Sequence, residues 1–345
     1  MNSLLRIFDA TEDIGTLSLA LQHLGIDHRI KGVLESDVVT NQVYQHLHGK
    51  VKTYTDSEVE LIPTFDLLGY RLSTRDLKGI QLEEGNLIIN KPTSRFDFTY
   101  SLIKKQKPRY LVMETTKQLI GKANCEFFER WLAWLKVLGY QTSYQVLNTK
   151  DYNLPQDRER LFVISILNPK RDFEFPISQL RTQTFRSCLD EKVDDSYYLY
   201  QRFNWFPSQL LKKETVHPIG YFSSSTNPSK HSMSQTIYSL TGLCPALPAN
   251  DYKRPIKVLL TPIIQVSQMN ENRFKSESIP FQTKVVRKLT PKECFRLMGM
   301  TDEIYNKMNE LELSNTKLYL LSGNSNILPI WEGILKNLLT KPMKP

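Results

Sequence analysis

The sequence is poor in long apolar runs and in glycine. No apolar stretch in the 345 residues approaches the roughly 20 residues that a membrane-spanning helix needs, so we expect no membrane segment. No basic leader with a long apolar run follows the first methionine, so we also expect no secretory signal. The 14 glycines are few for this length, which makes glycine-dependent turns scarce.

Cysteine is also scarce, and its spacing excludes two classes of site. The chain has no Cys-x-x-Cys pair and no metal-like spacing between its cysteines and its six histidines. The four cysteines are Cys125, Cys188, Cys244 and Cys294. We predict reduced thiols in a cytoplasmic protein, most of them buried as packing residues.

The charge balance points to an anionic partner. The net charge is +9, and almost all of the excess lies in residues 169–345. Nucleic acid is the first candidate for a basic chain, although a surplus of this size is also compatible with ordinary solubility charge.

Strand-like and helix-like patterns alternate along the first half of the chain. Apolar runs typical of strands occur at 4–10, 30–37, 62–70, 109–116 and 160–167. Helical patterns lie between them at 15–25, 39–49, 96–108 and 125–140. The helix at 125–140 has an aromatic stripe that favours a core position. This alternation predicts an α/β fold with a doubly wound sheet.

The pattern changes beyond Pro169. Residues 170–285 are rich in Ser, Thr, Asn, Pro and Tyr, with short extended pieces, and helical patterns return at 289–300 and 326–339. We therefore predict a large domain of residues 1–169 and 316–345, and a smaller, irregular domain of residues 170–315.

Four ordered blocks resemble the bacterial cytosine-5 DNA methyltransferases. In residues 138–165 the chain has the family's Gln-x-Arg-x-Arg signature as Gln156, Arg158 and Arg160. The strand at 109–116 resembles the one that carries the family's catalytic glutamate, which falls on Glu114. Two later blocks agree in the same order, at 285–300 and 322–330. The resemblance implies a Rossmann-like S-adenosylmethionine-dependent methyltransferase fold whose small domain is a target-recognition domain.

The resemblance also implies a reaction and its residues. In the family, a cytosine leaves the duplex, a Pro-Cys thiolate adds to C6, and C5 takes a methyl group from S-adenosyl-L-methionine. Glu114 would engage the base, supported by Arg158 and Arg160. Alternating positions of an extended chain point the same way, and two guanidiniums on one face suit a phosphate or a carboxylate. The alternative is that these residues only pack the sheet or lie on its surface.

The nucleophile of this reaction is missing. The loop "RLSTRDLKG" (71–79) places Ser73 where the family has proline and Thr74 at the nucleophile position, and no Pro-Cys dipeptide occurs anywhere in the chain. A threonine hydroxyl without a neighbouring base is a far poorer nucleophile than a thiolate. We therefore expect a catalytically degenerate member of the family.

The cofactor loop has changed as well. Thr11 stands at the family's phenylalanine and Asp13 at its first glycine, and an aspartate there would repel the cofactor's carboxylate. These two residues argue against binding of S-adenosyl-L-methionine. The residues that the resemblance places at the cofactor are Gly15, Glu35, Asp56, Asn324 and Ser325. Ordinary solvated carboxylates are an equally good interpretation of Glu35 and Asp56.

Four residues are predicted to contact double-stranded DNA. They are Gln156, Lys253, Arg254 and Arg287. In "CPALPANDYKRP" (244–255), Ala246 and Pro248 replace the threonines that are common in the family, so charge contacts from the basic pair would replace hydroxyl contacts to phosphate.

These features favour an inactive methyltransferase homologue in a restriction-modification context. It would bind DNA and act as an inactive partner or regulatory subunit of an active methyltransferase. The alternative is an active DNA (cytosine-5) methyltransferase, working alone or with a complementing subunit. A third hypothesis is a protein-interaction module with no DNA role.

Overall fold

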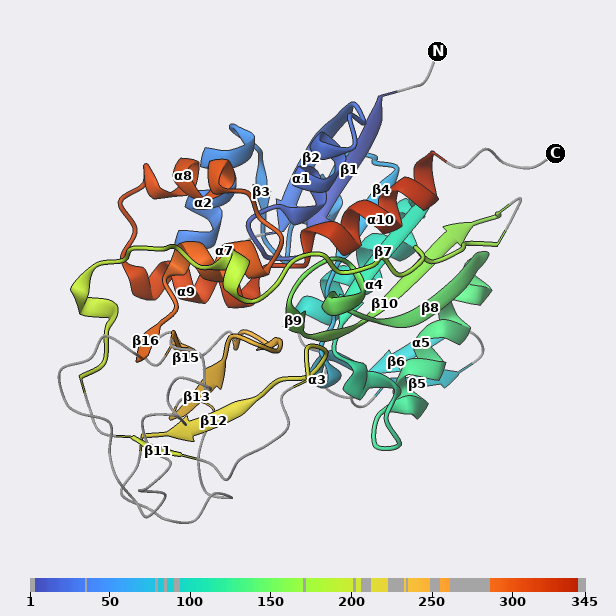
Figure 1. The fold of residues 1–345 in the computed structure, drawn as a ribbon. Helices are drawn as coiled ribbons and strands as arrows, with labels where there is room; N and C mark the ends of the chain where they lie inside the picture. The colour runs from blue at the N-terminus through green and yellow to red at the C-terminus, as the bar shows by residue number, and fades with distance from the viewer. Residues whose placement is uncertain are drawn as a thin grey trace. The chain divides into compact units, whose positions relative to one another are not determined.

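The computed structural model of the chain is shown in Figure 1. It describes residues 4–34, 36–77, 80–83, 86–89, 94–169, 172–200, 203–205, 212–222, 233, 235–248, 255–260 and 286–340. The chain forms two compact units. Unit 1 comprises Met1–Asn148, Glu159–Ser178 and Asn326–Pro345, and unit 2 comprises Thr149–Arg158 and Gln179–Ser325.

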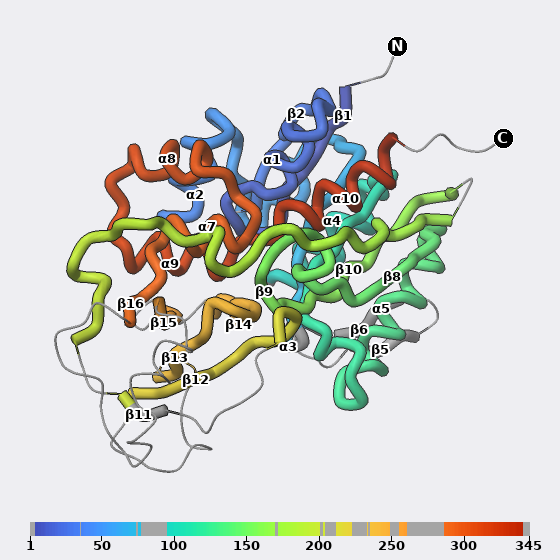
Figure 2. Tube along the Cα trace, in the orientation of Figure 1, coloured from blue at the N-terminus to red at the C-terminus, as the bar shows by residue number. Residues whose placement is uncertain are grey.

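Unit 1 is built on a seven-stranded sheet with the order β3-β2-β1-β4-β7-β10-β8. Its strands are β1 (Leu5–Ala10), β2 (His28–Leu34), β3 (Thr53–Tyr54), β4 (Leu67–Tyr70), β7 (Tyr110–Thr115), β8 (Tyr140–Asn148) and β10 (Glu159–Leu167). The five strands from β3 to β7 pair in parallel, whereas β10 is antiparallel to both of its neighbours. In the sheet order β10 lies between β7 and β8, and Figure 2 shows β10 beside β8. The doubly wound α/β sheet predicted from the sequence is therefore confirmed.

Helices cover both faces of this sheet. They are α1 (Thr16–His23), α2 (Val38–His48), α4 (Ser94–Gln106), α5 (Cys125–Val137) and α10 (Leu328–Leu339). Unit 1 also contains the short helix α3 (Thr74–Leu77) and a separate hairpin of β5 (Ile80–Glu83) and β6 (Asn86–Ile89). On one face, Phe8 and Met113 join the core formed with Phe96 of α4 and Trp131 of α5. On the other face α1 packs against α10 (Figure 1).

The described residues of unit 2 form a five-stranded sheet and three α-helices. The sheet order is β11 (Asn204–Trp205), β12 (Pro218–Tyr221), β13 (Thr236–Ser239), β15 (Lys257–Leu259) and β16 (Val286–Lys288). The helices are α7 (Pro291–Leu297), α8 (Asp302–Asn309) and α9 (Asn315–Asn324), and the short β9 (Gln156–Asp157) and β14 (Cys244–Pro245) form a separate parallel pair.

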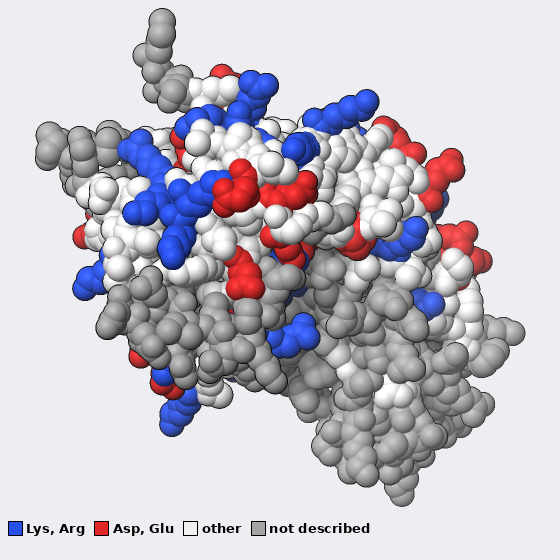
Figure 3. Space-filling model, turned by 180° about the vertical axis from the view of Figure 1, so that it is seen from behind, with Lys and Arg blue, Asp and Glu red and all other residues white. Residues whose placement is uncertain are grey.

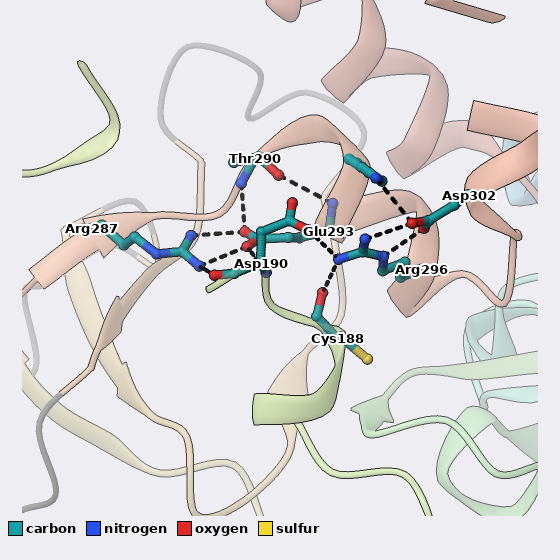
Figure 4. Close-up of polar contacts among 8 residues, drawn as sticks. Cys188, Asp190, Arg287, Thr290, Glu293, Arg296 and Asp302 are labelled. Carbon is teal, nitrogen blue, oxygen red and sulfur yellow. Dashed lines mark hydrogen bonds and ion pairs between the residues drawn. The ribbon is translucent and has the colours of Figure 1, made fainter. Parts of the chain in front are cut away.

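Two arginines organise the polar interior of unit 2 (Figure 4). Arg287 donates to both carboxylate oxygens of Glu293, at 2.8 and 2.6 Å, and both side chains are almost completely buried. Glu293 also closes a capping box with Thr290 at the start of α7. Arg296 binds both oxygens of Asp302 and one oxygen of Asp190. These contacts tie β16, α7 and α8 to the segment around residue 190.

The predicted domain division and the observed units differ at three segments. Residues 149–158 and 316–325 lie in unit 2, and residues 170–178 lie in unit 1. The first difference arises because β9 pairs with β14, and the second because α9 packs against α7. The division by function into a large and a small domain stays a prediction.

The cysteines are placed as free thiols. Cys188, Cys244 and Cys294 are buried in unit 2, whereas Cys125 is partly exposed at the start of α5. Burial raises the pKa of Cys188 to about 12, and it also raises the pKa of Cys244 and of Cys294. Within the described residues, no group of His, Cys, Asp and Glu is suited to hold a metal ion. No helix in that part of the chain is long and apolar enough to span a membrane.

Candidate functional site

Glu114 is a buried carboxylate at the carboxyl end of β7. Only 1% of its side chain is exposed. The indole Nε1–H of Trp331, on α10, donates to its Oε2 at 3.0 Å. The Nε of Arg160 lies 3.6 Å from its Oε1, and that oxygen accepts no hydrogen bond from any described residue. Glu114 therefore keeps one oxygen that a further donor can use.

Sheet register brings Arg160 to Glu114. Phe162 of β10 is the direct cross-strand partner of Glu114, and Arg160 lies two residues away on the same face. Burial lowers the pKa of Arg160, the Glu114 charge opposes this shift, and the nearby Arg71 charge adds to it. The Arg160 side chain is 24% exposed, so this pair leads from the interior of unit 1 to its surface.

Replacing Trp331 with phenylalanine is expected to lower the free energy of unfolding by about 2 kcal/mol. The variant leaves Oε2 of a buried carboxylate without its donor, and buried acceptors left unsatisfied cost about 1–3 kcal/mol. Urea denaturation of the single variants Trp331→Phe and Glu114→Leu and of the double variant measures the coupling between them. Purely additive effects would show that this hydrogen bond contributes nothing.

Gln156 and Arg158 have a different place from the one predicted. Both side chains are buried in unit 2, where Gln156 donates to the carbonyl of Leu297 at 3.1 Å. Arg158 donates to the carbonyls of Leu247 and Gly323, at 2.9 and 3.2 Å. The amide NH2 of Gln156 is thus used inside the protein, and its contact with DNA stays a prediction. Arg158 likewise holds backbone segments together.

The loop at the nucleophile position forms a short helix. Ser73 precedes α3 and makes reciprocal bonds with Asp76: its N–H donates to Oδ2 at 2.6 Å, and its Oγ accepts from the Asp76 N–H at 3.4 Å. This Ser-x-x-Asp pattern is a capping box with aspartate in place of glutamate. Thr74 is the first residue of α3, and its side chain lies outside the described set. The carbonyl of Leu72 accepts from Thr115, next to Glu114.

Asp13 occupies the N-terminus of α1. Its carboxylate is 3% exposed and accepts from the backbone N–H groups of Gly15 and Thr16, at 2.8 and 3.1 Å, and from the Thr16 hydroxyl at 2.5 Å. It also accepts from the N–H of Asn326, just before α10, at 3.1 Å. The donors that a helix N-terminus offers to an anionic ligand are thus already bound to a carboxylate of the chain.

A second buried carboxylate lies beside Asp13. Asp9 is 2% exposed, and the hydroxyl of Thr11 lies 2.6 Å from an oxygen of Asp9 and 3.1 Å from one of Asp13. The Tyr44 hydroxyl of α2 donates to Asp9 at 3.3 Å. Burial, followed by the charge of Asp13, raises the pKa of Asp9 to about 7. The residues that line this loop do not fit the carboxylate end of S-adenosylmethionine.

The remaining predicted site residues are dispersed. Gly15 lies at the N-terminus of α1, Asp56 in the turn after β3, and Asn324 at the end of α9. Ser325 is buried, and its hydroxyl donates to Leu321. Glu35, Lys253 and Arg254 lie outside the described residues. Arg287 is 1% exposed in its ion pair with Glu293, and its contact with DNA stays a prediction.

Sequence reasoning did not single out Trp331 or Asn326. Trp331 belongs to the run at 326–339, whose pattern predicted a helix but not an indole bond to Glu114. Asn326 accepts through Oδ1 from Arg71 while its N–H binds Asp13. Among the predicted catalytic residues whose side chains the structure describes, Glu114 and Arg160 are brought into direct contact.

The fold is that of an S-adenosylmethionine-dependent methyltransferase. Two solved structures share it: the Dnmt2 methyltransferase of S. pombe, with a TM-score of 0.65, 16% identity and coverage of 97% of this chain and 98% of that one, and the Entamoeba histolytica methyltransferase EhMeth, with a TM-score of 0.64, 14% identity and coverage of 98% of each chain. The predicted Rossmann-like fold is confirmed.

The chain belongs to the C-5 cytosine-specific DNA methylase family, whose model matches residues 74–340. It is 29% identical to the type II methyltransferase M2.ScrFI of Lactococcus lactis subsp. cremoris, over 80% of this chain and 67% of that protein. It is 23% identical to the orphan methyltransferase M.SPBetaI of Bacillus phage SPbeta, over 98% of each. The resemblance drawn from Glu114 and the Gln-x-Arg-x-Arg signature is confirmed, and members of this family use S-adenosylmethionine.

Proposed function

We propose that this chain is a catalytically inactive cytosine-5 methyltransferase homologue that binds double-stranded DNA. It acts as an inactive partner or regulatory subunit of an active methyltransferase, in a restriction-modification context like that of its relatives. The observation that carries the proposal is the helix at the nucleophile position. Ser73 and Asp76 cap α3 where the reaction needs a Pro-Cys thiolate, and the chain has no Pro-Cys dipeptide.

The placement of the four thiols supports this proposal. Three of them are buried in unit 2, and a raised pKa keeps each of these protonated near neutral pH. Cys125 is the thiol of unit 1, and its Sγ donates to the carbonyl of Lys122 at the start of α5. That helix packs on the face of the sheet opposite to the Glu114 side chain, as the alternation along β7 requires.

The net positive charge of the chain supports DNA as the partner, but it does not define a contact surface. On the face drawn in Figure 3, basic and acidic side chains of the described residues lie next to one another. The predicted basic pair, Lys253 and Arg254, lies outside those residues, and its DNA contact stays a prediction. A binding affinity that falls steeply with salt would distinguish phosphate contacts from a pure protein-interaction role.

The chain alone is expected to transfer no methyl group to DNA. Purified protein, tritium-labelled S-adenosylmethionine and mixed-sequence duplex DNA are incubated together, with an active family member as the positive control. The same proteins are then tested for covalent trapping on DNA that contains 5-fluorocytosine, because trapping requires a nucleophile bonded to C6. Label incorporated into cytosine by this chain would end the proposal.

One observation favours the alternative of an active methyltransferase that needs a complementing subunit. Glu114 and Arg160 lie together, and an oxygen of Glu114 accepts no hydrogen bond within the described residues. A base could still be held there, with the thiol supplied by another chain. Trapping on 5-fluorocytosine DNA that appears only after a second subunit is added, with the crosslink on that subunit, would support this alternative.

A further inference from the structure

In the loop between β1 and α1, backbone N–H groups donate to a side chain of the same loop. In a doubly wound sheet, the turn after the first strand and the following helix N-terminus form a site for the anionic part of a ligand, because their N–H groups point outward and the helix dipole favours negative charge. Here the N–H groups of Gly15 and Thr16 both donate to Asp13. The negative group at this helix end belongs to the chain.

The backbone of this loop lies close against α2 at Gly15. Gly15 has a φ of 89°, and a Cβ built there would lie 2.1 Å from Nε2 of His48 and 2.9 Å from the Tyr44 ring. The same Nε2 donates to the carbonyl of Ile14 at 2.9 Å. The end of α2 therefore holds the loop from one side while Asp13 holds it from the other.

Electrostatics oppose a further anion at this place. Asp9 and Asp13 are both buried, and the Thr11 hydroxyl lies between them. A ligand carboxylate would have to displace Asp13 from its donors and remain next to its negative charge. Like charges at close range in a protein interior repel far more strongly than in water.

We propose that Asp13 is an internal substitute for the carboxylate of S-adenosylmethionine, so that the chain holds its site in the closed arrangement without the cofactor. The proposal deepens the function proposed above, on which it rests for the identity of the displaced ligand. Asp13 accepts from the N–H of Asn326, and the Asn326 side chain accepts from Arg71. These contacts connect Asp13 to the segment before α10 and to the residue that follows β4. Helix α10 carries Trp331, which holds Glu114.

The contacts of Asp13 determine whether DNA binding depends on the cofactor. In an enzyme that needs its cofactor to order this region, DNA binding responds to cofactor concentration. In this chain the bonds that position α10 and Glu114 are made by its own residues, so its DNA binding is independent of S-adenosylmethionine and of S-adenosylhomocysteine. Such a chain remains in its binding-competent state whatever the supply of methyl donor.

Calorimetric titration and thermal unfolding with S-adenosylmethionine and S-adenosylhomocysteine test the proposal. The wild-type chain should show no saturable heat and no shift in Tm at ligand concentrations up to about 1 mM, a range in which a micromolar ligand would shift Tm clearly. Asp13→Asn and Asp13→Gly should both lower Tm. The matched control is Asp37→Asn, because Asp37 caps α2 through two backbone N–H groups but makes no bond to Asn326.

The expected order of Tm is wild type above Asp37→Asn, with Asp13→Asn and Asp13→Gly both below Asp37→Asn. Gain of saturable S-adenosylmethionine binding by Asp13→Gly would support the proposal directly. Micromolar binding by the wild-type chain would overturn it, and so would an Asp13→Gly variant as stable as wild type. Binding of the cofactor without methyl transfer would defeat this inference alone, whereas methyl transfer would defeat the proposed function.

Discussion

Replacing Arg287 with alanine is expected to destabilise unit 2 by about 3–5 kcal/mol, the cost of leaving one partner of a buried ion pair uncompensated. Arg287 and Glu293 are 1% and 0% exposed, so water cannot take the place of the lost guanidinium. Glu293 also accepts from the N–H groups of Thr290 and Asp190, so its displacement would disturb the start of α7 as well. Denaturant unfolding followed by circular dichroism measures the loss.

The control for this prediction removes both charges. In Arg287→Met with Glu293→Gln, the glutamine oxygen can still accept from one of the two N–H groups, that of Thr290 or that of Asp190, and no buried charge remains. Replacing a buried ion pair by neutral groups is often close to neutral for stability, so the double variant should recover most of the loss. If it also binds DNA with the wild-type salt dependence, the structural role of Arg287 is established. An Arg287→Ala protein of wild-type stability with a smaller salt slope would instead identify a phosphate contact.

Stability is expected to fall by on the order of 3–5 kcal/mol between pH 4 and pH 7 because of Asp9 alone. The folded-state pKa of Asp9 is raised to about 7 by burial and by Asp13, against 3.8 for the ordinary group. Below pH 4 the carboxyl is protonated in both states. As the pH rises, the unfolded chain releases this proton first, so unfolding becomes progressively more favourable until the folded state also ionises near pH 7.

The variant Asp9→Asn isolates this contribution. Its amide keeps an acceptor for Thr11 and offers a donor to the Tyr44 hydroxyl, whose oxygen lies 3.3 Å from the carboxylate. The difference in unfolding free energy between wild type and variant should grow in favour of the variant from pH 4 to pH 7 and then level off. Asp27→Asn, at an exposed carboxylate, serves as the control. A difference that stays constant with pH would contradict the prediction.

The elements of unit 1 could be predicted because their signals are local. Continuous apolar runs marked β7 and β10, and the aromatic stripe marked α5, so the doubly wound sheet followed from the sequence alone. The edge strand β8 was not predicted. Its residues are mostly polar and only Tyr140 and Leu147 are buried, so it carries no continuous apolar signal.

The side-chain contacts of the site could not be predicted in the same way. The alternation of Gln156 and Arg158 was visible, but their partners are carbonyls of Leu297, Leu247 and Gly323, far away in the sequence. No periodic pattern reports such contacts, because they depend on how distant elements pack. The sequence "STRD" (73–76) has the spacing of a capping box, which predicts a helix start, although we interpreted it only as a changed nucleophile loop.

The cap of α3 makes a change to the family's Pro-Cys motif unfavourable for folding. Proline at position 73 would remove both the N–H that donates to Asp76 and the hydroxyl that accepts from it, at a cost of about 1 kcal/mol for a lost cap. A mutation toward the family's Pro-Cys motif would thus lower folding stability before any thiol was present. Selection for a stable fold would then oppose that motif without any selection against the reaction.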